Sequence, residues 1–139
     1  MGAYMAHHAL VPDRALVSPS RRTRQTWEGV AAGLPNPVPV TYEDLLYDAK
    51  PETILSSLRE IEPEVTRLLL IGHNPGLHEI ARLLIASGDV EAREQINEAL
   101  PTTGFAVIEF AVHNWDELHP SSGRLERFVT PRLLKTTTD

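Results

Sequence analysis

The sequence contains no cysteine, which excludes disulfide bonds and thiolate metal sites and agrees with a reducing cytoplasm. It has no apolar run of the roughly 18 residues that a membrane span requires. Its first eight residues lack a basic segment and a long apolar segment, so we expect no signal peptide. The net charge of −6 disfavours binding to nucleic acid or to an anionic membrane. A bound anion would therefore need a local cluster of positive charge.

The length of 139 residues suits one domain, spanning residues 1–139, with a single core. Apolar spacing predicts a helix over residues 2–10, a strand over 15–17, and a helix that Ser18 caps, Pro19 opens and Gly33 ends. Residues 34–40 read as a proline-rich loop into an edge strand. Further helices are expected from Pro51, after Gly76 and over 90–100, and further strands over 68–71, 105–110 and 124–129.

This alternation predicts an α/β sandwich around a largely parallel sheet. The run Leu68–Ile71 is continuously apolar, as in a strand that is buried on both faces. In such sheets the ligand site lies beyond the carboxyl ends of the strands. Two strand-to-helix junctions, after Val17 and after Ile71, fall at that edge.

The first junction carries three arginines, Arg21, Arg22 and Arg24, in the opening turns of a helix. Cations at a helix N-terminus are disfavoured by about 0.3–1 kcal/mol each, because that end of the helix is already positive. A bound anion reverses this cost, because the guanidinium groups and the backbone N–H groups then share its charge. Arg22 is the strongest candidate. For Arg21 and Arg24 the favoured reading is that of solvated residues that form salt bridges with nearby acids.

The second junction, Gly72-His-Asn-Pro-Gly76, places His73 at the end of a buried strand. A histidine there can donate to a phosphate oxygen or transfer a proton near neutral pH. The alternative is a histidine that only ties down its own loop. His73 and His78 are five residues apart, which does not put them on one helical face, so we expect no metal site.

Three segments resemble the histidine phosphatase superfamily (phosphoglycerate-mutase-like), and within it the small phosphohistidine phosphatases of the SixA type. They are Ser18-Pro-Ser-Arg-Arg-Thr-Arg-Gln-Thr26, Leu70-Ile-Gly-His-Asn-Pro-Gly-Leu77 and Gly123-Arg-Leu-Glu-Arg-Phe-Val-Thr-Pro131. The resemblance extends over essentially the whole chain. It implies a three-layer α/β/α sandwich and a cytoplasmic phosphatase that needs no metal or other cofactor.

The resemblance also implies roles for individual residues. Arg22 is expected to be the phosphate-binding arginine of the second motif, and His73 the second histidine of the pocket. Ser18 and Asn74, at the same two junctions, complete the residues expected to bind phosphate. A pocket of arginines and histidines would neutralise the oxygens of a transferring phosphoryl group.

The sequence departs from the family at its start. The family opens with a strand that ends in Arg-His-Gly or Arg-His-Ala and supplies the nucleophile, yet no Arg-His pair occurs in this chain. His7 and His8 fall within the first predicted helix, and His113 and His119 in a late loop, so we expect surface roles for all four. Our hypothesis is that Met1 is an internal methionine and that the nucleophile strand lies upstream.

The general acid of the reaction is not identified by the sequence. Larger relatives use a carboxyl group after the second strand, where this chain has Glu43, Asp44 and Asp48. Glu43 and Asp48 are the candidates, although the resemblance implies that phosphohistidine phosphatases do without a dedicated acid. Imidazole is a better leaving group than an alkoxide, so catalysis without a dedicated general acid is chemically reasonable.

The expected substrate is phosphohistidine on a signalling protein. One alternative is a catalytically inactive domain that binds phosphate or phosphoprotein through Arg22 and His73. Another is a small-molecule phosphomonoesterase of the same superfamily, which the short chain disfavours because it has few inserted loops to form a sugar pocket.

Overall fold

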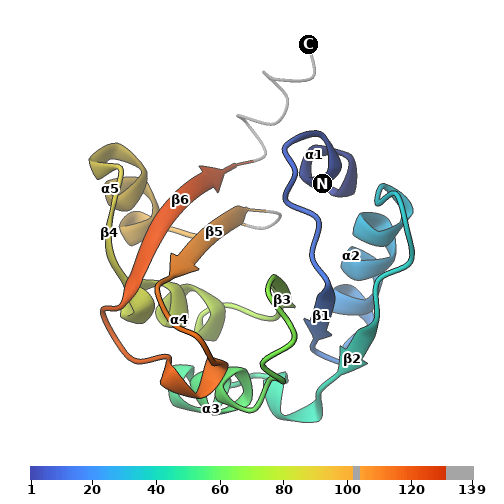
Figure 1. Cartoon of the computed structure of the whole chain (residues 1–139), viewed down its shortest axis with the longest axis horizontal. Coiled ribbons are helices and arrows are strands. Elements are labelled where there is room, and N and C mark those ends of the chain that lie inside the picture. Colours follow the sequence, from blue (N-terminus) through green and yellow to red (C-terminus); the bar gives the residue numbers. More distant parts are fainter. Residues whose placement is uncertain (102–103, 131–139) are drawn as a thin grey trace.

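The computed structural model describes residues 1–101 and 104–130. Helices are α1 (Gly2–His7), α2 (Arg21–Ala32), α3 (Pro51–Arg59), α4 (Gly76–Leu84) and α5 (Val90–Glu98), with short 3-10 turns η1 (Asp44–Leu46) and η2 (Trp115–Glu117). Strands are β1 (Arg14–Val17), β2 (Val40–Tyr42), β3 (Leu68–Ile71), β4 (Ile85–Gly88), β5 (Phe105–Phe110) and β6 (Gly123–Val129). The predicted α/β class is confirmed (Figure 1). No helix in these two ranges is long and apolar enough to cross a membrane.

The strands of the described residues form two separate sheets of three, rather than the one sheet that the sequence predicts. The first has the order β2-β1-β3 and is entirely parallel. The second has the order β4-β6-β5, in which β6 is parallel to β4 and antiparallel to β5. Figure 1 shows the second sheet on the far side of β3 from β1.

Helices cover both faces of the first sheet, because the side chains of its strands alternate between faces. From β1, Ala15 and Val17 pack with residues of α1 and α2, namely Met5, Trp27 and Val30. Leu16 points to the opposite face and packs with residues of α3 and α4, among them Ile54, Leu58, Ile80 and Leu84. A third cluster joins α4 and α5 to β6 through Ala81, Ile96, Leu125 and Phe128.

The start of α2 lies two residues later than the sequence suggests. The N-cap is Ser20, whose hydroxyl accepts a hydrogen bond from the Thr23 N–H at 3.3 Å. The Ser18 N–H instead continues the β1–β3 ladder by donating to the Ile71 carbonyl at 3.0 Å. The prediction that Ser18 caps this helix is therefore wrong, and its side chain is left available for another partner.

Two other boundaries also differ from expectation. The first helix ends at His7 rather than near Leu10, because Ala9 takes a left-handed φ of 56° that a helix does not continue through. Strand β4 has no counterpart in the prediction. Its sequence Ile-Ala-Ser-Gly follows α4 directly and carries too few apolar residues to signal a strand.

Gly76 holds α4 against the preceding chain, since a Cβ built there would lie 2.0 Å from the Ala49 carbonyl oxygen. We predict that Gly76→Ala lowers the free energy of unfolding by about 1–3 kcal/mol, the usual range for overpacking. Gly29 in α2 is the control, because a Cβ there meets nothing within 4 Å. Gly29→Ala should raise stability by about 0.5–1 kcal/mol, as expected for glycine inside a helix. Urea denaturation of both variants tests the pair; equal effects would contradict the close approach at Gly76.

Candidate functional site

The candidate site centres on a hydrogen bond between Ser18 and His73. The Ser18 hydroxyl lies 2.7 Å from Nε2 of His73, across 55 positions of sequence. Ser18 is fully buried and His73 is half-buried, so the bond links the interior to the surface. Both residues are expected phosphate ligands from the sequence, and the fold brings them together.

Parallel strand pairing produces this contact. Val17 lies opposite Ile71 in the register of β1 and β3, so the two chains leave the sheet at the same edge. Thr23 then fixes the turn after β1, because its hydroxyl donates to the Ser18 carbonyl at 2.6 Å. The buried Thr23 side chain therefore positions Ser18 from inside α2.

The arginines of the first junction differ in their surroundings. Arg24 is engaged: its Nε donates to the Pro19 carbonyl at 2.8 Å and its guanidinium lies 4.2 Å from the centre of the Tyr42 ring. Arg22 is exposed in the first turn of α2, and within the described ranges its guanidinium has neither a hydrogen-bond partner nor an ion-pair partner. Of these two, Arg22 is the one whose charge is uncommitted.

The Asn74 side chain is engaged in hydrogen bonds that stabilise the second junction. Its Nδ2 donates to the Leu100 carbonyl at 2.7 Å, and its Oδ1 accepts from the His78 N–H at 3.1 Å. The peptide bond from Asn74 to Pro75 is cis. Asn74 thus holds the turn that presents His73, and binding phosphate through its side chain would require it to release these partners.

The segment after β2 reaches the site through an aromatic side chain. The Tyr47 ring packs edge-on against the His73 ring, with centroids 5.4 Å apart, and Tyr47 remains 64% exposed. Of the two acid candidates, Glu43 accepts a long hydrogen bond of 3.5 Å from the Leu45 N–H, while Asp48 is exposed with φ of 50°. The sequence did not identify Tyr47, because nothing local distinguishes it from any other exposed tyrosine.

The other histidines have roles in local structure. His8 lies near Arg127, whose Nη1 is 3.4 Å from its Nδ1. Loss of hydration and the positive charges of Arg127 and His7 lower the pKa of His8, which disfavours its use as an anion ligand. His78 contacts the Ile96 carbonyl through Nε2. His113 and His119 are exposed.

The chemical capacity of the site follows from these neighbours. An imidazole, a hydroxyl and an uncommitted guanidinium can donate hydrogen bonds to an anion such as a phosphoryl group. Within the described residues, no group of three or more His, Asp or Glu side chains is arranged to hold a metal ion. A cavity of about 800 Å³ lies elsewhere, and Ser18, Arg22 and His73 are not in its lining.

The chain is similar to two mycobacterial proteins over most of its length. It is 33% identical to the uncharacterized protein Rv1276c of Mycobacterium tuberculosis, with 94% of this chain and 81% of that protein covered. It is 31% identical to the uncharacterized protein ML1117 of Mycobacterium leprae, covering 94% and 79% of the two chains. No family model matches the sequence.

The fold of the chain is similar to that of solved structures. A protein from Agrobacterium tumefaciens assigned as a phosphohistidine phosphatase SixA superposes with a TM-score of 0.73 at 27% identity, covering 94% of this chain and 75% of that one. The protein histidine phosphatase SixA complexed with tungstate superposes with a TM-score of 0.71 at 20% identity, covering 96% and 78%. The latter likeness concerns the fold alone.

The Ser18–His73 bond should contribute measurably to stability. We predict that Ser18→Ala lowers the free energy of unfolding by about 1 kcal/mol, the typical net value of one hydrogen bond. Ser56→Ala is the control: its exposed hydroxyl donates to the Glu52 carbonyl within α3, and a change of no more than about 0.5 kcal/mol is expected at such a surface site. Chemical denaturation followed by fluorescence measures both, and an unaffected Ser18→Ala variant would show that the bond does not form in solution.

Proposed function

We propose that the chain is a member of the histidine phosphatase superfamily and a metal-independent phosphatase that acts through a phosphohistidine intermediate. The fold that it shares with the SixA-type protein of Agrobacterium tumefaciens supports this proposal. Its proposed substrate is phosphohistidine on a signalling protein, and its proposed location is the cytoplasm. The observation that carries the proposal is the 2.7 Å contact between Ser18 and His73 at the ends of two adjacent parallel strands.

The electrostatics of the site support binding of a phosphoryl group. The protein is acidic overall, so diffuse attraction does not bring phosphate to it. Arg22 stands in the first turn of α2, where its charge and the positive end of the helix repel each other until an anion lies between them. In the proposal Arg22 and His73 hold the phosphoryl oxygens, and Ser18 orients the His73 ring through Nε2.

In the proposal, phosphoryl transfer proceeds in two steps. A nucleophilic imidazole nitrogen attacks phosphorus, forming one N–P bond as the N–P or O–P bond of the substrate breaks and the leaving group takes a proton. Water attacks the resulting phosphohistidine, forming an O–P bond as the N–P bond breaks, and inorganic phosphate departs. The cationic and hydrogen-bonding side chains stabilise the charge on the transferring group in both steps.

We place the nucleophilic histidine on a strand upstream of Met1. The 139 residues contain no Arg-His pair, and none of the six histidines other than His73 contacts Ser18 or Tyr47 in the described ranges. His73 itself is proposed as a phosphate ligand. The chain that begins at Met1 would thus hold the binding half of the site without its nucleophile.

Protonation of the leaving group is proposed to need no dedicated carboxylic acid when the substrate is phosphohistidine. Asp48 is exposed and directly follows Tyr47, whose ring contacts His73. It is therefore proposed as the better placed of the two general-acid candidates when the substrate is a phosphoester. Glu43 is proposed mainly to cap η1.

The test compares a polypeptide extended upstream of Met1 with the chain that starts there. Each is assayed without metal on a phosphohistidine peptide and on p-nitrophenyl phosphate. The extended form should hydrolyse both, and the shorter form should be slower by about 10⁴–10⁶-fold, the cost of removing a nucleophile. In the extended form, His73→Ala and Arg22→Ala should each lower kcat by about 10²–10³-fold, as expected for one stabilising donor.

His119→Ala and Arg82→Ala serve as matched controls, because both residues are exposed and lie outside the Ser18–His73 pair. Neither should change kcat by more than about twofold. If neither form hydrolyses phosphate but phosphate binding is lost in Arg22→Ala, the domain is an inactive phosphate-binding module. Steady preference for small phosphosugars over the phosphohistidine peptide would point to the small-molecule phosphomonoesterase.

A further inference from the structure

Few large apolar side chains are exposed on the described part of the molecule, and two of them lie in one short segment after β2. They are Leu45 and Tyr47, which are 60% and 64% exposed, and the third is Val90 in α5 at 67%. A single exposed apolar side chain is ordinary on a protein surface. Tyr47 differs because its ring packs edge-on against His73, a residue of the candidate site, with centroids 5.4 Å apart.

The segment that carries Tyr47 is fixed at both of its ends. At its start, the Glu43 N–H donates to the carbonyl of Val17, the last residue of β1, at 2.9 Å. At its end, the Ala49 carbonyl oxygen lies in the space that a Cβ on Gly76 would occupy, beside the first residue of α4. The segment therefore reaches from the first strand-to-helix junction to the second, and both junctions border the candidate site.

The neighbours of Tyr47 within the segment hold its side chain outward. Leu46 is 2% exposed and packs in the apolar cluster that contains Leu16. The Tyr47 N–H donates to the Asp44 carbonyl at 3.1 Å, which closes the short turn η1. Because Leu46 is held in the core, the side chain that follows it emerges at the surface, where it contacts His73.

Tyr47 contributes little to the core. It belongs to none of the three apolar clusters, whereas Tyr42 packs in the cluster formed with α1 and α2. Within residues 1–101 and 104–130 the Tyr47 hydroxyl has no hydrogen-bond partner. Tyrosine is enriched at binding surfaces, because its ring offers a large apolar contact and its hydroxyl a polar one. Both parts of the Tyr47 side chain are available to a ligand of the candidate site.

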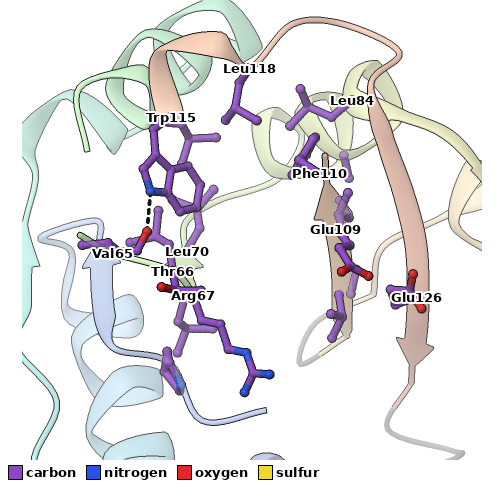
Figure 2. Close-up of a pocket in the computed structure, with 18 of the residues that line it drawn as sticks. Val65, Thr66, Arg67, Leu70, Leu84, Glu109, Phe110, Trp115, Leu118 and Glu126 are labelled. Carbon is purple, nitrogen blue, oxygen red and sulfur yellow. Dashed lines mark hydrogen bonds between the residues drawn. The ribbon is translucent and has the colours of Figure 1, made fainter. Parts of the chain in front are cut away.

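The exposed ring is separate from the cavity of about 800 Å³. Residues of both sheets line that cavity, among them Leu70 and Phe110 (Figure 2). Neither Tyr47 nor His73 is in its lining. A ligand that contacts the Tyr47 ring would therefore lie at the candidate site and not in the cavity.

From this placement we infer that Tyr47 is a specificity-determining residue, whose ring packs against the leaving group of the substrate and favours leaving groups that are planar and aromatic. The inference rests on the proposed function, in which Arg22 and His73 hold the phosphoryl oxygens. The Tyr47 ring is unsuited to that task, because the face of an aromatic ring is electron-rich and repels anions. The part of the substrate that remains for it to contact is the organic group that carries the phosphoryl group.

A ring preference has a definite size. Two aromatic rings in contact gain about 3–10-fold in affinity beyond the burial of their surface, the equivalent of about 0.7–1.4 kcal/mol. A saturated ring of the same size covers a similar area without that gain. Imidazole and phenol groups would therefore be favoured over the aliphatic groups of phosphoserine and of phosphosugars.

The experiment measures binding of two matched phosphonates to the polypeptide that is extended upstream of Met1. Phenylphosphonate carries an aromatic ring, cyclohexylphosphonate carries a saturated one, and neither is a phosphate ester. By calorimetry, phenylphosphonate should bind about 3–10-fold more tightly than cyclohexylphosphonate to the unaltered protein. This ratio should fall to about one in Tyr47→Ala and should be kept in Tyr47→Phe, since the ring and not the hydroxyl makes the contact.

Two controls separate contact with the ligand from a structural effect. Leu45→Ala removes an equally exposed side chain from the same turn, and it should leave the ratio unchanged. Inorganic phosphate should bind Tyr47→Ala within about twofold of the unaltered protein, because the ring does not hold the oxygens. If phosphate affinity fell as far as phenylphosphonate affinity, Tyr47 would act by placing His73, and the inference would be wrong. An unchanged ratio in Tyr47→Ala would also overturn it.

Turnover distinguishes the failure of this inference from the failure of the proposed function. In Tyr47→Ala, kcat/KM should fall about 3–10-fold with p-nitrophenyl phosphate and less than about twofold with acetyl phosphate, whose leaving group is not aromatic. Hydrolysis with equal effects on both substrates would keep the phosphatase and overturn the inference. Ring-selective phosphonate binding without any hydrolysis would keep the inference and count against the phosphatase. Absence of phosphonate binding would overturn both.

Discussion

The parallel pairing of β1 with β3 is the constraint on which the candidate site depends. Because Val17 lies opposite Ile71, the chain leaves both strands at one edge, and residues 55 positions apart come within 2.7 Å of each other. Neither helix α2 nor helix α4 could supply this contact by itself. The sheet places the two junctions together, and each helix then holds its own junction in place. In α2 this is done by the hydrogen bond from Thr23 to the Ser18 carbonyl, and in α4 by the close approach of Gly76 to the Ala49 carbonyl.

Charge in this protein is organised by local structure and not by composition. Acidic residues exceed basic ones, yet the first turn of α2 concentrates arginines where a helix disfavours them. The fold offsets part of this electrostatic cost, because Arg24 stacks on the Tyr42 ring and donates a hydrogen bond to the Pro19 carbonyl. Arg22 keeps its charge exposed. An uncommitted cation in the first turn of a helix is a coherent basis for the proposed recognition of a phosphoryl group.

Strand β3 leads the chain to His73 and also lines the cavity of about 800 Å³. Leu68–Ile71 has both faces covered by helices, and its remaining exposure is confined to one edge. The strand that carries the chain to His73 is thus also the strand with an open side.

Local patterns in the sequence were enough for most elements and for the two junctions. The apolar runs at 68–71 and 105–110, the proline at 51 and the glycine at 33 predicted strands and helix ends that the structure has. These signals depend on neighbours only a few residues away, where backbone sterics and side-chain periodicity act. The motif around His73 likewise pointed to a superfamily that the comparisons support.

The sequence by itself thus determined most of the strands, the two junctions that follow β1 and β3, and which side chains have the chemistry for phosphate. Only the tertiary structure decided that Ser20 and not Ser18 caps α2, that Asn74 is bonded to Leu100, and that Tyr47 packs on His73. It also decided that the strands of the described residues form two sheets, and that residues of both sheets line one cavity. Each of these outcomes depends on contacts between distant segments, whose free energies are set by the packing of the whole core and have no counterpart in any short stretch of sequence.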